Sequence, residues 1–285
     1  MNFPMVAYLI GHILRLEALF MIPAMAISFF NKEPVSARAF LITILVLLAA
    51  SLITISKPKN KGFYTKEGFF VTAMTWIIMS LFGALPFFIS GEIPNYLFAV
   101  FETVSGFTTT GSSILTNVEA MSKGMLYWRS FTHWLGGMGV LVFLLAILPM
   151  TQGAGNSLHI MRAEIPGPEV GKLVPKLHKS AKILYLIYFG MTLIQMVLLL
   201  IGRMPLFDTV CITFGTAGTG GFGILNSSCG DYSPYCQVVI TVFMALFGVN
   251  FSIFYLLLLR EFSQALLNQE LRVYLGIMLS AIALI

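Results

Sequence analysis

The chain has 285 residues, of which 58% are hydrophobic and 10% are charged, and its formal net charge is +5 at pH 7. A soluble domain carries about 25% charged residues, and several apolar runs here reach the roughly 20 residues that cross a bilayer. This composition excludes a soluble globular protein and predicts an all-α integral membrane protein.

Long apolar runs follow one another from the N-terminus. The predicted spans are residues 3–30, 39–56, 69–90, 126–150, 182–202 and 236–259. The first run continues to Phe30 with no small-residue cleavage site after it, so we interpret it as a retained helix and not as a signal peptide. A seventh run starts near residue 273 and has only 13 residues, too few to cross about 30 Å at 1.5 Å per residue. We therefore expect the sequence to be a fragment, or one half of a protein assembled from parts.

Basic residues are distributed unevenly between the connections. Eleven of the 17 Lys and Arg residues lie after the second, fourth and sixth spans. Because cytoplasmic loops carry the excess of positive charge, we predict a multi-pass membrane protein with a cytoplasmic N-terminus. Connections 91–125 and 203–235 then face outward. The net charge is explained by topology and anionic lipid, so the expected partner is membrane lipid and no nucleic acid.

The two outward connections have an unusual composition. Each contains an apolar stretch too short to span, at residues 95–107 and 205–217, with Pro94 or Pro205 where a helix would start. Each then continues into a polar segment, SGFTTTGSS at 105–113 or GTAGTGGFG at 215–223. Non-helical backbone at membrane depth is tolerated only inside protein or along a water-filled path. A short helix followed by such backbone is the layout of an ion-selectivity loop.

The two regions also resemble each other. Gly111 aligns with Gly221 at an offset of 110 residues, whereas FETV at 101–104 matches FDTV at 207–210 at an offset of 106. The two offsets disagree by about one helical turn, and we adopt the glycine register because it lies nearer the expected chemistry. The predicted unit of span, short helix, polar loop and span occurs at 69–150 and again at 182–260. Parallel repeats of this kind build a pore along the membrane normal.

The polar loops suit a desolvated monovalent cation. Rings of backbone carbonyls replace the water shell of potassium, and glycine adopts the dihedral angles that such a backbone needs. The predicted potassium ligands are Thr109, Thr110, Gly111, Thr219, Gly220 and Gly221. The alternative, that small residues only let helices pack closely, fits Gly136, Gly137 and Gly139 better because they lie inside a predicted span.

Six ionisable residues near the loops have open roles. Glu102 is either a cation-attracting group at the outer mouth or a buried structural partner. Asp208 could also attract cations at the outer mouth. We favour the other interpretation, in which it is an acid in the first turn of a helix, stabilised there by the helix dipole. Arg129 and His133 lie four residues apart on one helical face, where tying a loop to the helix is favoured over gating. Cys229 and Cys236 in the second outward connection either pair in an oxidising compartment or stay as two thiols.

Several strings together resemble the TrkH/Ktr/HKT superfamily of potassium transporters, and its bacterial TrkH subfamily in particular. They are SGFTTTGSSIL, YWRSFTHWLGGMGVLV (127–142), MRAEIPGP (161–168) and TGGFG (219–223). The resemblance implies a two-helix unit followed by four helix–pore-loop–helix repeats, with one filter glycine from each repeat, here Gly111 and Gly221. It also implies a location in the bacterial inner membrane, a homodimer of the complete protein and a cytosolic, nucleotide-binding, TrkA-like regulatory subunit.

On this basis the chain divides into four parts and amounts to half of a four-repeat ion transporter. They are an N-terminal two-helix unit (1–60), a first repeat (61–150), a second repeat (151–262) and the start of a third (263–285). The expected function is potassium uptake through a carbonyl filter. The alternatives are ion-coupled symport or a path that admits sodium, and, more remotely, a membrane enzyme or scaffold. Paired carboxylates, an activated nucleophile or a metal cluster would indicate an enzyme, and none lies at membrane depth, so no enzyme is expected.

Overall fold

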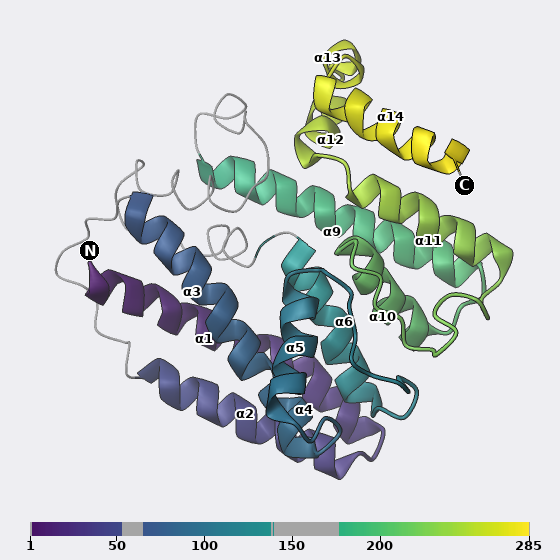
Figure 1. Cartoon of the computed structure of the whole chain (residues 1–285). Coiled ribbons are helices and arrows are strands. Elements are labelled where there is room, and N and C mark those ends of the chain that lie inside the picture. The colour runs from purple at the N-terminus through teal and green to yellow at the C-terminus, as the bar shows by residue number, and fades with distance from the viewer. Residues whose placement is uncertain (1, 53–64, 138, 140–176, 285) are drawn as a thin grey trace.

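The computed structural model describes residues 2–52, 65–137, 139 and 177–284, and every regular element within these ranges is helical (Figure 1). Several expectations, including the basic segment at 57–61 and the MRAEIPGP string, lie outside the described residues. Four helices are long and apolar enough to cross a membrane, and a bent pair makes up to five. The expected all-α membrane fold is therefore confirmed.

The N-terminal helices α1 (Phe3–Phe30) and α2 (Pro34–Leu52) pack against each other along their lengths (Figure 1). The Asn2 side chain caps α1 by accepting a hydrogen bond from Met5 N, and Pro34 starts α2 five residues earlier than predicted. Glu33, in the turn between them, accepts hydrogen bonds from Lys123 N (2.9 Å) and Gly124 N (3.3 Å). This carboxylate ties the pair to the start of α6.

The first repeat follows the predicted order of span, short helix, loop and span. Its elements are α3 (Thr65–Gly83), α4 (Leu85–Ser90), α5 (Tyr96–Phe107) and α6 (Lys123–Gly137). The short helix α5 starts where Asn95 accepts a hydrogen bond from Leu97 N, within one residue of the predicted boundary. The predicted span 126–150 coincides with α6 up to Gly137, and most of its remainder lies outside the described residues.

The second repeat contains α9 (Leu177–Ile201), α10 (Leu206–Ala217), α11 (Pro234–Phe247) and α12 (Phe251–Leu258). The prediction of one continuous span over 236–259 is wrong, because α11 and α12 meet at 93°. Gly248 ends α11, and the Asn250 side chain starts a new helix by accepting from Ser252 N. Helices α13 (Phe262–Leu266) and α14 (Gln269–Leu284) follow.

Helix α6 lies between the two repeats and packs on both short helices, α5 and α10, and on α1 (Figure 1). Its aromatic side chains form much of the core. Trp128 Nε1 donates to Gly83 O at 3.0 Å, and the ring of Trp134 contacts Tyr188 and Phe214 of the second repeat. The polar segment of each repeat is therefore held against the same helix.

Candidate functional site

The two short helices end in the same hydrogen-bonded turn. At the end of α5, Thr110 N donates to Ser105 O (2.9 Å) and Thr109 N donates to Gly106 O (3.0 Å). At the end of α10, Gly220 N donates to Gly215 O (3.2 Å) and Thr219 N donates to Thr216 O (2.8 Å). Both patterns are Schellman motifs. Equivalent residues differ by 110 in number, which confirms the glycine register.

Each turn contains two left-handed residues separated by one position. Gly111 and Gly221 have φ values of 77° and 79°, as the choice of glycine predicts. Thr109 and Thr219 are also left-handed, at 55° and 56°, which the sequence analysis did not foresee. For a residue with a side chain this conformation costs roughly 1–2 kcal/mol. Strain of this sort persists where the surrounding structure enforces it, and it concentrates at functional sites.

The two polar loops touch each other. A Cβ atom on Gly111 would overlap the carbonyl oxygen of Gly220, so only glycine fits at residue 111. Gly111 and Gly220, which are 109 positions apart in the sequence, are thus in backbone contact. Both residues were predicted as potassium ligands. Within the described residues, no hydrogen bond joins the other predicted ligands across the two loops. The Thr110 hydroxyl lies 2.8 Å from that of Thr108, and Gly221 is exposed.

Thr219 also lines a cavity of about 820 Å³ between α11 and α14. Its walls are largely apolar and include Met244, Met278 and Ile282, with Gln237 and Thr241 as polar members. An alanine Cβ at Gly221 would lie 3.9 Å from Met244 Cε. The second loop therefore borders this cavity at Thr219.

The carbonyl groups of both turns lack donors. The backbone N–H groups of Thr109, Thr110, Thr219 and Gly220 are used to close the helix ends. In contrast, no donor in the described part of the chain bonds to the carbonyl oxygens of residues 108–111 and 218–221. Backbone carbonyls are strong acceptors that normally have a partner. These oxygens are chemically suited to a cation.

Glycines of α6 allow the helix to approach both turns. A Cβ atom on Gly136 would overlap Phe107 O, and one on Gly137 would lie 2.9 Å from Gly218 Cα. The packing interpretation is therefore confirmed for these two residues. Gly139 was expected inside the span, but it has φ 70° and its N–H donates to Gly136 O at 2.9 Å. The backbone at Gly139 is thus in a turn that follows α6.

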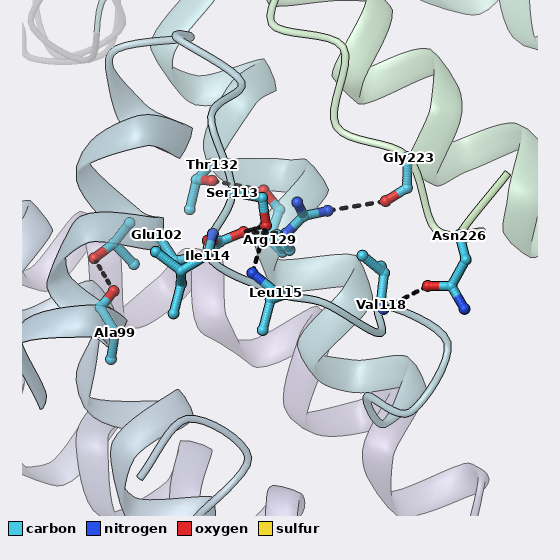
Figure 2. Close-up of polar contacts among 11 residues, drawn as sticks. Ala99, Glu102, Ser113, Ile114, Leu115, Val118, Arg129, Thr132, Gly223 and Asn226 are labelled. Atoms are coloured by element: carbon cyan, nitrogen blue, oxygen red, sulfur yellow. Dashed lines mark hydrogen bonds and ion pairs between the residues drawn. The ribbon is translucent and has the colours of Figure 1, made fainter. Parts of the chain in front are cut away.

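Glu102 is a buried partner and not a residue of the outer mouth. It is 1% exposed and accepts hydrogen bonds from Arg129 Nε (2.6 Å), Ser113 Oγ (2.9 Å) and Ile114 N (3.1 Å) (Figure 2). Because all of these donors hold the carboxylate, the first loop is fixed to α5 just after Gly111. The structural interpretation of Glu102 is confirmed.

Arg129 also reaches the second loop. Its Nη1 donates to Gly223 O at 2.8 Å (Figure 2). Its guanidinium lies 3.6 Å from the centre of the Phe222 ring. The His133 ring stacks on the same Phe222 at 4.0 Å. The expectation that these residues tie a loop to the helix is confirmed. The roles of Phe222 and Gly223 were not predicted from the sequence, where their one signal is an aromatic residue inside a glycine-rich segment.

The remaining polar groups lie at the edge of the site. Asp208 occupies the first turn of α10, as favoured, and accepts a hydrogen bond from Tyr232 Oη at 3.1 Å. Asn226 joins the loops a second time, because its side chain accepts from Val118 N at 2.8 Å (Figure 2). Cys229 and Cys236 are free thiols, so the paired alternative is not what the structure has.

Comparison with known proteins gives consistent matches. The family model described as "TrkH: Cation transport protein" matches residues 33–275. The chain is 32% identical over 283 residues to the Trk system potassium uptake protein TrkG of Escherichia coli K12, covering 97% of this chain and 58% of that protein. It is 34% identical over 256 residues to TrkH of Salmonella typhimurium, covering 87% and 52%.

A solved structure agrees with these matches. The crystal structure of the potassium transporter TrkH from Vibrio parahaemolyticus superimposes with a TM-score of 0.73 and 26% identity, over 90% of this chain and 52% of that one. The chain spans about half the length of the curated relatives it matches.

Proposed function

The chain belongs to the TrkH family of cation transport proteins, and we propose that its two polar loops form part of a potassium-selective filter for uptake of the ion into the cell. The proposed ligands are backbone carbonyls of Thr109, Thr110, Gly111, Thr219, Gly220 and Gly221. One observation carries the proposal: two loops in backbone contact present carbonyl oxygens to which no donor in the described residues bonds. The relatives' names, potassium uptake proteins, favour potassium as the ion.

The proposal includes a division of the chain and its partners. Residues 1–60 form a two-helix unit, residues 61–150 and 151–262 form two repeats, and residues 263–285 begin a third. The name "Trk system" of the relatives supports a multi-component assembly, and we propose a TrkA-like cytosolic regulatory subunit and a homodimer. The ligand that we propose for the filter is the transported potassium ion itself.

Flux measurements in liposomes test passive conduction against coupled transport. The protein is expressed from its own locus in its own host, purified and reconstituted. An inside-negative potential should drive potassium uptake with sodium and proton gradients clamped at zero, because a carbonyl filter needs no second ion. Uptake that requires an imposed sodium or proton gradient would favour the symporter alternative. The absence of potassium uptake under every gradient would refute the proposed function.

Cysteine labelling tests the proposed orientation, with the N-terminus and basic connections in the cytoplasm and the protein in the inner membrane. Cys229 is half-buried in the loop after α10, whereas Cys211 and Cys236 are buried. A membrane-impermeant maleimide applied from outside the inner membrane should label Cys229 alone, and a Cys229→Ser variant should stay unlabelled. Labelling of Cys229 only from the cytoplasmic side would reverse the topology.

The rate of that labelling should depend on pH in a defined direction. Burial raises the pKa of the Cys229 thiol above its ordinary value, and a hydrogen bond with Ser228 offsets part of this. Because the thiolate is the reactive form, its fraction at neutral pH is smaller than that of an exposed cysteine. The labelling rate should therefore still be rising at a pH where a small free thiol has levelled off.

A further inference from the structure

The side chain of Arg129 contacts both polar loops, and we infer that it is a positioning residue that sets the spacing of the two filter segments and thereby the selectivity for potassium over sodium. The inference rests on the proposed function. Arg129 is 3% exposed and lies in the middle of α6, between α5 and α10. It touches none of the proposed ligands in the contacts that the structure describes, so its effect is exerted through the residues that follow them.

On the side of the first loop, Arg129 acts through Glu102. The distance from Arg129 Nε to Glu102 Oε1 is 2.6 Å, and both side chains are almost completely buried. The same carboxylate accepts from Ser113 Oγ and from Ile114 N, two and three positions after Gly111. A buried carboxylate that lost its cation would be strongly disfavoured. The ion pair therefore holds Glu102, and Glu102 holds the loop.

On the side of the second loop, Arg129 acts directly. Nη1 donates to the carbonyl oxygen of Gly223, two positions after Gly221, and the guanidinium lies over the ring of Phe222, one position after it. The same ring also stacks on the imidazole of His133, one turn further along α6. Phe222 is 3% exposed, so the backbone that leaves the second turn is anchored to α6.

Both sets of contacts lie within three residues after the filter glycine of their repeat. The Arg129 guanidinium holds the segment after Gly111 through Glu102. It holds the segment after Gly221 by direct contacts with Gly223 and Phe222. Because Gly111 and Gly220 are in contact, a shift of either loop would change the geometry of both sets of carbonyls. Selectivity in such filters depends on the size of the site or on the field of its carbonyls, and both follow from this spacing.

The Arg129→Lys variant distinguishes a role in positioning the two loops from a general role in folding. Lysine keeps a positive charge for Glu102, but its compact ammonium cannot donate to Gly223 O in the same fork or stack on Phe222. In the liposome assay, with rubidium as the potassium tracer, the ratio of potassium to sodium uptake should fall about tenfold, the factor that corresponds to one lost charge-assisted hydrogen bond. The matched control is Arg15→Lys, since Arg15 bonds Ser51 within the N-terminal helix pair, and it should keep the wild-type ratio.

A second variant makes the test independent of lysine packing. Phe222→Leu keeps an apolar side chain and the Glu102–Arg129 pair but removes the cation–π contact, and the ratio should fall about fivefold. If both variants keep a ratio within about twofold of wild type, the inference is overturned. If Arg129→Lys does not accumulate in the membrane, Phe222→Leu decides, and a wild-type ratio for it overturns the inference.

Failure of the inference and failure of the proposed function are distinguishable. A wild-type protein that transports potassium selectively, with unchanged ratios in both variants, removes the positioning role and leaves the proposed function in place. A folded wild-type protein that transports neither ion removes the proposed function. In that case backbone hydrogen exchange decides on the positioning role: faster exchange of residues 222–226 in Arg129→Lys supports it, and unchanged exchange overturns it.

Discussion

Replacement of Gly111 by alanine is expected to abolish selective potassium uptake. The new Cβ would overlap the carbonyl oxygen of Gly220, a backbone atom of the facing loop that has no flexible side chain to move aside. Residue 111 is also left-handed, with φ 77°, and that strain of about 1–2 kcal/mol alone corresponds to roughly tenfold in an equilibrium constant. We expect potassium uptake in liposomes to fall to a tenth of wild type or less, with loss of discrimination against sodium.

The chain offers a matched control for this substitution. Gly91, at the end of α4, has φ 78°, and an added Cβ there would meet no atom within 4 Å. Gly91→Ala imposes the same backbone strain without the overlap, so its uptake should stay close to wild type. Gly221→Ala lies between the two, because φ is 79° and only Met244 Cε comes within 4 Å. Unchanged potassium uptake and selectivity in Gly111→Ala would contradict the assignment of the first loop.

Arg129→Met is expected to give the largest loss of stability. The Glu102 side chain is completely buried, and the substitution would leave its carboxylate with only Ser113 and Ile114 N as donors. Breaking a buried ion pair by removing one partner destabilises a protein by about 3–5 kcal/mol. The midpoint of thermal unfolding in detergent, followed by size-exclusion chromatography, should fall clearly below that of the wild type.

Two further variants control this measurement. Arg38→Met changes an exposed arginine that bonds Pro34 O on its own helix and should shift stability by less than about 0.5 kcal/mol. Glu102→Gln combined with Arg129→Met removes both charges, so it should recover part of the loss, since no uncompensated charge stays buried. A midpoint for Arg129→Met equal to that of Arg38→Met would show that the ion pair does not stabilise the fold.

The short helices and the polar turns were predictable because their signals are local. The apolar stretches 95–107 and 205–217 became α5 and α10 within one residue at their starts and with the predicted ends, since a proline or asparagine starts each helix and a polar segment ends it. The register of Gly111 and Gly221 also followed from the sequence, because a left-handed position favours glycine wherever it occurs.

Features that depend on contacts between distant segments were not predictable. The left-handed Thr109 and Thr219 contradict the ordinary preference of threonine, and only the Schellman turns and the packing of α6 explain them. The 93° bend between α11 and α12 interrupts a run that is mostly apolar, with Gly248 and Asn250 at the break. Mean hydropathy over such a run does not indicate the direction of the helices.

The sequence by itself determined a helical membrane protein, two short helices followed by polar turns, and the glycines in those turns. Only the tertiary structure decided that Gly111 meets Gly220, and that Arg129 joins Glu102 to a carbonyl 94 positions away. The physical reason is that hydrophobicity and backbone preference act within a few residues of the chain. A buried ion pair or a contact between two backbones depends on which segments the packed helices bring together.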